Sequence, residues 1–327
     1  MPNLMLTTSC NLSCPYCFAV DVMDDVGMKQ MSRETFIGVL DWIDRGDVPQ
    51  YGIQLMGGEP MLYPDIVAIA EEVHTRARHI TIYSNGTVPI VDRLVELSGS
   101  GAIDWVINAN PPEMYNRKQQ EIFDRNLSLL SQQASLCFNF HSLNMDFDHV
   151  FDCIEKFDNR RLVKLGITLP TTVKSNDYVG VGMFGEVEKQ LEKFFVEARR
   201  HGVLIDTECG APFCLFSNLV QEFTDLIRDD LISHCGSRLD ITPDGKVINC
   251  LPLSRIAAIP YDQFPDYMAA STWFHKWLTT YGVLGLGEDM CLGCETLNAG
   301  LCKACAANCL GDFNRIQLPP LPDKPRI

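Results

Sequence analysis

Three cysteines near the N-terminus constrain this chain of 327 residues more than any other feature of its sequence. Cys10, Cys14 and Cys17 have a C-x3-C-x2-C spacing, and the apolar run Leu4–Leu6 before them predicts a short buried strand. Three thiolates on one tight loop can bind three corners of a cubane iron–sulfur cluster. These cysteines leave the fourth iron without a ligand, so the spacing indicates an open coordination position for a substrate or cofactor.

The motif resembles that of the radical S-adenosylmethionine (radical SAM) enzymes, which place an aromatic residue before the third cysteine, as Tyr16 is here. The resemblance implies that Cys10, Cys14 and Cys17 bind a [4Fe–4S] cluster whose free iron chelates the amino and carboxylate groups of SAM. An electron from an external one-electron reductant, such as a flavodoxin or ferredoxin, would cleave SAM to methionine and a 5′-deoxyadenosyl radical. That radical abstracts hydrogen from a substrate. A structural zinc loop is the alternative interpretation.

Apolar strands alternate with amphipathic helices through the first two hundred residues, which predicts βα units in a parallel sheet with right-handed crossovers. The expected strands cover 4–8, 52–56, 80–83, 105–109, 136–140 and 163–168, with 203–206 as a further candidate. The expected helices cover 32–43, 64–77, 91–97, 119–130, 148–157 and 187–200. Six units are too few for a closed barrel. The family resemblance implies an α/β fold with a partial (β/α)6 TIM-like barrel.

Ligands bind at the carboxyl ends of the strands in parallel α/β folds, and a polar motif follows the second expected strand. This motif is Gly57-Gly58-Glu59-Pro60. Two glycines let the backbone approach a ligand closely, and a carboxylate accepts hydrogen bonds from an ammonium group. The string resembles the GGEP motif with which radical SAM enzymes bind the amino group of SAM. A Gly-Gly turn without a ligand is the alternative.

Two further strands end in candidates for SAM binding. Ser84 and Asn85 follow the third expected strand, where the family commonly has a Ser/Thr-Asn-Gly string close to the SAM carboxylate and ribose. An ordinary Asn-Gly turn is the alternative there. Ile167 ends the sixth expected strand, where the family often packs an apolar residue on the adenine, although a core isoleucine is equally natural at this position.

The fourth expected strand ends in two asparagines, Asn108 and Asn110. They share one face of the strand because side chains alternate with a period of two. The pair is a candidate for hydrogen bonds to SAM or substrate, and turn capping before Pro111 is the alternative. Peptide-modifying relatives often carry an Asp-Gly pair near this position, and its absence here leaves the substrate class open.

The fifth expected strand carries three polar side chains, Cys137, Asn139 and His141, that alternate with Phe138 and Phe140. If the phenylalanines pack on helices, alternation turns the polar residues toward the barrel lumen. Asn139 is then a candidate contact of the SAM ribose, and His141 a candidate substrate base. Cys137 could return a hydrogen atom to a substrate radical, whereas a buried structural thiol is the alternative.

The last third of the chain is rich in cysteine. Fourteen cysteines in a chain without a secretion signal indicate metal ligands rather than disulfides. Nine of them follow residue 205, namely Cys209, Cys214, Cys235, Cys250, Cys291, Cys294, Cys302, Cys305 and Cys309. The segment 239–250 predicts a hairpin turning at Asp244-Gly245. The pattern resembles the SPASM/Twitch extension of anaerobic sulfatase-maturating and peptide-maturing radical SAM enzymes, which implies one or two auxiliary [4Fe–4S] clusters.

Nine cysteines exceed the eight ligands of two four-cysteine clusters, so their spacing leaves the grouping open. We expect the first auxiliary cluster to bind Cys235, Cys250, Cys309 and either Cys209 or Cys214. The second would bind Cys291, Cys294, Cys305 and Cys302. Zinc is the alternative metal for this second group.

Charge and hydropathy exclude two classes of partner. A net charge of −15 repels phosphate backbones, so we expect no nucleic-acid substrate. No apolar run approaches the ~18 residues of a membrane span, and no basic segment followed by an apolar core begins the chain. We therefore expect a cytoplasmic protein with no membrane partner. It would consist of a radical SAM partial barrel over 1–205, a SPASM/Twitch domain over 206–315 and an exposed tail over 316–327.

The predicted activity is that of a radical SAM oxidoreductase or maturase, which the SPASM resemblance associates with oxidative modification or cross-linking of a peptide or protein side chain. The chain opens directly on its first expected strand, so we expect a separate protein to supply any peptide recognition. A dehydrogenase or epimerase of a small molecule such as an amino sugar is one alternative. An iron–sulfur electron-transfer or sensing protein is an alternative of another class.

Overall fold

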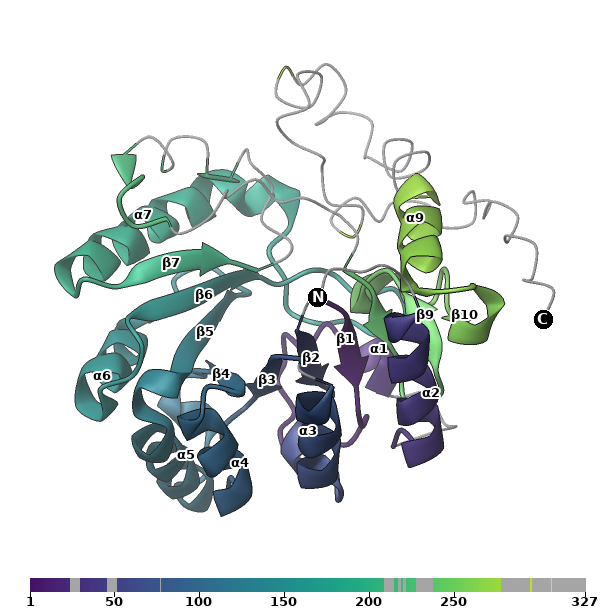
Figure 1. Cartoon of the computed structure of the whole chain (residues 1–327). Coiled ribbons are helices and arrows are strands. Elements are labelled where there is room, and N and C mark those ends of the chain that lie inside the picture. The colour runs from purple at the N-terminus through teal and green to yellow at the C-terminus, as the bar shows by residue number, and fades with distance from the viewer. Residues whose placement is uncertain are drawn as a thin grey trace.

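The computed structural model describes residues 1–23, 30–45, 52–76, 78–208, 215–216, 219, 222–227, 238–277, 295 and 307. Its ten-stranded sheet has the order β10-β9-β8-β1-β2-β3-β4-β5-β6-β7 (Figure 1). Strands β1 to β7 are Asn3–Met5, Ile53–Met56, Ile80–Ser84, Ile103–Asn108, Ala134–Phe140, Leu162–Ile167 and Leu204–Thr207. They pair in parallel, each with its neighbour in sequence. Because β7 ends the strand order, these strands form an open, partial barrel.

Helices connect the parallel strands and cover the outer side of the curved sheet (Figure 1). The helices α1 to α7 are Val20–Met23, Arg33–Asp44, Ile66–Thr75, Asp92–Gly99, Arg117–Leu130, Asp148–Phe157 and Phe184–Arg200. Each expected helix is present, with ends shifted by a few residues. Ser32 caps α2 through its side chain, which accepts a hydrogen bond from the backbone N–H of Thr35 at 3.0 Å. The α/β fold with a partial barrel is therefore confirmed.

The apolar face of β5 shows how the helices are held on the sheet. Phe138 stacks on Phe194 of α7 at a ring-centroid distance of 5.8 Å, and Phe140 meets the same ring edge-on at 5.9 Å. Phe147 contacts Phe194 as well. Burial of each such ring contributes roughly 1.5–3 kcal/mol to folding. The expected packing of both phenylalanines on helices is confirmed.

The expected hairpin is present, and it joins the same sheet on the side of β1. Strand β8 (Asp240–Ile241) pairs in parallel with β1 and antiparallel with β9 (Lys246–Ile248). Gly245 turns the hairpin with a φ of +75°, which suits glycine. Strand β10 (Ile259–Pro260) pairs with β9 and precedes helix α9 (Tyr267–Trp277).

Two connections anchor this second part of the chain to the barrel. The indole N–H of Trp42, on α2, donates a hydrogen bond to the carbonyl oxygen of Phe264 at 3.1 Å. The Asn3 amide donates to the Asp240 carboxylate at 2.6 Å. The boundary that we expect at 205/206 therefore separates segments that share one sheet. No helix in the described ranges is both long and apolar enough to cross a lipid bilayer.

Candidate active site

The three N-terminal cysteines lie on residues 10–17, which we call the Cys loop, at the carboxyl end of β1. Leu6 prolongs β1 beyond its last residue, because its N–H donates to the Met56 carbonyl at 2.9 Å and its carbonyl accepts from Met31. The N–H of Cys17 donates to the carbonyl of Cys14 at 3.1 Å, which makes the loop tight. All three thiols are partly buried.

The electrostatics of the Cys loop fit a site for a cationic metal centre. Burial raises the pKa of all three thiols, and burial together with the charges of Cys17 and Cys10 raises that of Cys14 to about 11. The sulfurs are thus close enough to repel one another as thiolates, and iron would offset that repulsion. In the described residues no three His, Cys, Asp or Glu side chains are arranged for one metal ion. A site for a single ion is not what a cubane cluster needs, because its three cysteine ligands each bind a different iron.

Two asparagine amides point at these sulfurs. Nδ2 of Asn85 lies 3.8 Å from Sγ of Cys10, and Nδ2 of Asn110 lies 4.0 Å from Sγ of Cys14. Hydrogen bonds to cysteine sulfur favour the thiolate and tune the potential of an iron–sulfur cluster. The side chains around the Cys loop therefore suit thiolate ligands.

The two glycines after β2 allow two backbone segments to pack closely against each other. The N–H of Gly58 donates to the carbonyl of Thr7 and that of Glu59 to the carbonyl of Ser9, both at 2.8 Å. A Cβ at Gly57 would lie 2.5 Å from the Thr7 oxygen, and one at Gly58 would overlap the Ser9 carbonyl. Glycine at both positions lets the end of β2 lie directly against the start of the Cys loop. Pro60 then begins the short 3-10 helix Pro60–Leu62.

Glu59 is completely buried and binds protein groups through both carboxylate oxygens. Oε1 accepts from Ser84 Oγ at 2.9 Å and from the N–H of Met61 at 3.0 Å, while Oε2 accepts from the N–H of Asn85 at 2.7 Å. Burial raises the pKa of Glu59 to about 7, although these hydrogen bonds act to lower it. The carboxylate thus orients the loop after β3, and the expected contact of this motif with the amino group of SAM stays a prediction.

That loop is tied in turn to the Cys loop. Asn85 donates through Nδ2 to Oδ1 of Asn11 at 2.9 Å and accepts from the hydroxyl of Thr87 at 2.7 Å. Nδ2 of Asn11 donates to the same hydroxyl at 2.8 Å. Asn11 and Thr87 were not expected as site residues, because short polar side chains in loops have no distinctive spacing. Ser84 and Asn85 are both buried, with Ser84 accepting from the N–H of Gly86.

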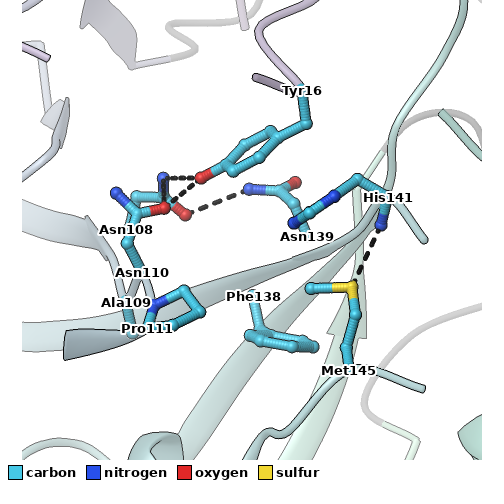
Figure 2. Close-up of a pocket in the computed structure, with 9 residues that line it drawn as sticks. All are labelled: Tyr16, Asn108, Ala109, Asn110, Pro111, Phe138, Asn139, His141 and Met145. Carbon is cyan, nitrogen blue, oxygen red and sulfur yellow. Dashed lines mark hydrogen bonds between the residues drawn. The ribbon is translucent and has the colours of Figure 1, made fainter. Parts of the chain in front are cut away.

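The aromatic ring of the Cys loop lies over the ends of β4 and β5 (Figure 2). The Tyr16 hydroxyl donates to Oδ1 of Asn110 and accepts from Nδ2 of Asn108 at 2.7 Å. Asn139 donates to Oδ1 of Asn108 at 3.0 Å. The Tyr16 ring stacks on the His141 ring at a centroid distance of 4.6 Å. Periodicity predicts that Asn108 and Asn110 share one face of their strand and that Asn139 and His141 share one face of the next, and the structure brings the two pairs together.

A small pocket lies beside this network. Figure 2 shows the residues that line it, which are Tyr16, Asn108, Ala109, Asn110, Pro111, Phe138, Asn139, His141 and Met145. Nδ1 of His141 is buried and has no hydrogen-bond partner in the described part of the chain. Burial lowers the pKa of His141, so its ring is neutral at neutral pH. A neutral imidazole with one unpartnered nitrogen can accept a proton or a hydrogen bond.

Cys137 lies deeper in the lumen and does not line the pocket. Burial raises the pKa of its thiol to about 12, with the charge of Glu208 adding to the effect. Lys164 of β6 lies between two carboxylates, 3.0 Å from Asp206 and 3.1 Å from Glu208. The period of two along β6 and β7 could have revealed these charges as lumen residues. Ile167 is buried in the hydrophobic core at the end of β6.

One of the nine C-terminal cysteines, Cys250, lies in the described residues, directly after β9. Its neighbours Ile248 and Leu251 pack in a small apolar cluster with Met5 and Val22, and Cys17 packs against that cluster. Cys250 itself packs against the main hydrophobic core, while its neighbours Ile248 and Leu251 reach the cluster that Cys17 contacts. The remaining cysteines fall outside the described residues, namely Cys209, Cys214, Cys235, Cys291, Cys294, Cys302, Cys305 and Cys309.

Residues 4–108 match the profile of the radical SAM superfamily, so this segment forms a radical SAM domain, a domain that works with a [4Fe–4S] cluster and SAM. The PqqA peptide cyclase of Ruegeria pomeroyi is 22% identical over 325 residues, covering 94% of this chain and 83% of that protein. The pre-heme d1 synthase of Dinoroseobacter shibae is 35% identical over 98 residues, 28% of this chain and 23% of the relative.

Solved structures share the fold. SuiB of Streptococcus suis with bound S-adenosylmethionine superposes with a TM-score of 0.62 at 14% identity, over 93% of this chain and 71% of SuiB. SuiB with its precursor peptide SuiA gives 0.57 at 15% identity, over 77% of this chain and 59% of that chain. The protein anSMEcpe with bound AdoMet gives 0.54 at 16%, over 77% and 74%. These likenesses extend the common fold beyond the segment 4–108.

Proposed function

We propose that this radical SAM protein is a maturase that oxidatively modifies or cross-links a side chain of a peptide. The observation that carries the proposal is the meeting of three elements at one edge of the parallel sheet. These are the Cys loop, the loop after β3 that Glu59 orients, and the Tyr16–Asn108–Asn139 network beside a pocket. Two relatives act on peptides by name, a PqqA peptide cyclase and SuiB in complex with the precursor peptide SuiA.

Different residues of the chain bind the cluster and the parts of SAM. Cys10, Cys14 and Cys17 would hold the [4Fe–4S] cluster, which with bound SAM and one electron from an external donor would supply a 5′-deoxyadenosyl radical. Glu59 holds Ser84 in place, and the Gly57–Pro60 backbone, Ser84 and Asn85 bind the methionyl part of SAM. Tyr16 and Ile167 exclude water from the adenine.

The pocket residues then act on the substrate. Asn108 and Asn139, which are joined by a 3.0 Å hydrogen bond, orient the SAM ribose and the substrate beside it. His141 lines the pocket, and its neutral imidazole accepts a proton as the substrate is oxidised. Cys137 lies behind this layer and would donate a hydrogen atom in an epimerisation. Net oxidation is favoured here because Cys137 does not line the pocket.

Iron–sulfur clusters bound by the C-terminal cysteines would receive the electron that oxidation of the substrate radical releases. We propose that Cys250 and the other eight C-terminal cysteines bind one or two auxiliary [4Fe–4S] clusters. In this proposal residues 1–205 form the radical SAM partial barrel, residues 206–315 the SPASM/Twitch domain and residues 316–327 the tail. Thiolate ligands need a reducing compartment, so we place the protein in the cytoplasm with a flavodoxin- or ferredoxin-like donor. A separate protein supplies recognition of the peptide.

The test is SAM cleavage by anaerobically reconstituted protein with dithionite, comparing wild type with the Cys10→Ala/Cys14→Ala/Cys17→Ala variant. We expect 5′-deoxyadenosine from wild type alone, a loss of ~4 irons in the variant, and ~4 or ~8 irons remaining. Peptides encoded beside the gene are then added, and mass spectrometry follows the loss of two hydrogens. Cleavage of SAM with oxidation of an amino sugar and of no such peptide would favour the small-molecule alternative.

A further inference from the structure

The loop after β6, residues 168–179, lies on the Cys loop, and we call it the β6 loop. The N–H of Asp177 donates to the carbonyl of Pro15 at 2.9 Å. Nδ2 of Asn176 donates to the carbonyl of Tyr16 at 3.4 Å and to that of Leu169 at 2.9 Å. The negative charge of Asp177 also acts to raise the pKa of His141, which lines the pocket.

A single carboxylate holds this loop from the other side. Asp21, on the short helix α1 just after the Cys loop, is 1% exposed. Its Oδ2 accepts from the N–H and the hydroxyl of Thr172 at 2.8 and 2.7 Å and from the N–H of Val173 at 3.0 Å. Its Oδ1 accepts from the N–H of Lys174 at 2.9 Å. Three consecutive backbone donors and one hydroxyl thus converge on one side chain.

The β6 loop has little apolar packing of its own at this point. Val173 is 69% exposed and Tyr178 is 44% exposed, so burial contributes little to holding residues 172–174 in place. Charge-assisted hydrogen bonds to a buried carboxylate are among the stronger polar contacts in proteins. Asp21 is therefore the contact outside the loop that holds residues 172–174, beside hydrogen bonds of Thr171 with Lys174 and Asn176 within the loop.

Helix α1 is itself fixed to the hairpin side of the sheet. The Arg255 guanidinium donates to the carbonyl of Asp21 at 2.7 Å. Ala19 and Val22 pack against Ile248 and Leu251. Asp21 therefore connects two regions separated by about 150 positions in sequence, the Cys loop and the β6 loop, through a helix that cannot move freely.

We propose that Asp21 is a positioning residue for SAM binding, because its carboxylate locks the β6 loop onto the Cys loop and so fixes Tyr16 and the pocket mouth. The inference rests on the proposed function, and it adds a residue that no motif identifies. Asparagine cannot replace aspartate here. Its NH2 group would face backbone N–H groups that need an acceptor.

The experiment compares Asp21→Asn, Asp21→Ala and the milder Thr172→Val with wild type. Asp152→Asn, at an exposed position of α6, is the control for loss of one negative charge. Trypsin cleavage after Lys174 reports on the β6 loop without any cofactor. We expect it to be about tenfold faster or more in both Asp21 variants, intermediate in Thr172→Val and unchanged in the control.

The second readout is the electron paramagnetic resonance spectrum of the reduced cluster during SAM titration. We expect half-saturation at about tenfold more SAM in Asp21→Asn, and restoration toward wild type in Asp21→Glu. One outcome is that the wild-type spectrum responds to SAM while Asp21→Asn behaves like wild type in both the trypsin cleavage and the SAM titration. In that case the proposed role of Asp21 is wrong and the proposed function is unaffected. A wild-type spectrum indifferent to SAM overturns the proposed function. If circular dichroism shows Asp21→Ala unfolded, Asp21→Asn and Thr172→Val decide the result.

Discussion

The hydroxyl of Tyr83 donates a hydrogen bond to Oε1 of Glu208 at 2.9 Å, although Tyr83 belongs to β3 and Glu208 directly follows β7. Three strands lie between β3 and β7 in the sheet, so this bond crosses the lumen. Glu208 also pairs with Lys164. The polar cluster in the lumen therefore helps to set the curvature of the open barrel beneath the pocket.

Removal of the Tyr83–Glu208 hydrogen bond tests whether the lumen cluster stabilises the barrel. We expect Tyr83→Phe to lower the free energy of unfolding by about 1–2 kcal/mol, because the partly buried Glu208 carboxylate loses one donor but keeps Lys164. Lys164→Met should cost more, about 3–5 kcal/mol, since it leaves Asp206 and Glu208 without their cation. Urea denaturation measures both, with the half-exposed Tyr178→Phe as the control. Equal stability of Tyr83→Phe and wild type would mean that the lumen bond contributes nothing.

The two glycines after β2 should tolerate no side chain. Gly58→Ala would push a Cβ into the Ser9 carbonyl and displace the start of the Cys loop. We expect it to lower the free energy of unfolding by about 2 kcal/mol or more and to reduce iron incorporation. Gly99→Ala is the matched control, because nothing lies within 4 Å of its Cβ, at the end of α4. That variant should be neutral or slightly stabilising, by up to about 1 kcal/mol.

The contact between the hairpin and β1 should depend on pH. Burial raises the pKa of Asp240 from its usual 3.8 to about 7, against the hydrogen bond from Asn3. The folded protein binds this proton more tightly than the unfolded chain. Its contribution to stability is therefore complete below about pH 4 and is lost as pH rises through about 7. Asp240→Asn removes this titration, so its stability relative to wild type should rise by about 2–3 kcal/mol between pH 5 and pH 8 in thermal unfolding, whatever the variant loses at the hydrogen bond from the Leu251 N–H.

The two catalytic candidates should separate kinetically. We expect His141→Ala to slow substrate oxidation by about 10²–10⁴-fold, because a positioned base is lost. SAM cleavage without substrate should fall far less. Cys137→Ala should leave oxidation nearly unchanged, since Cys137 does not line the pocket. The opposite pattern, with Cys137→Ala inactive and deuterium from solvent retained in the wild-type product, would favour epimerisation.

Local signals in the sequence predicted the elements well. The extents of β5 and α6 agree with expectation within two residues, because alternation on β5 and helical periodicity on α6 are strong over their whole length. Helix α1 was not expected, since four residues give no periodic signal and Asp21 is held by contacts with a distant loop.

The sequence by itself determined the order of strands and helices, the place of the Cys loop after β1, and the faces that Phe138 and Asn139 occupy. These depend on periodicity and on residues near one another in the chain. The tertiary structure alone decided that Glu59 binds the loop after β3, that Asp21 holds the β6 loop, and that β8 pairs with β1. Such partners lie 26 to 237 positions apart. Hydrogen bonds at that separation depend on how the loops are arranged in space, and the periodicity of the sequence contains no information about that arrangement.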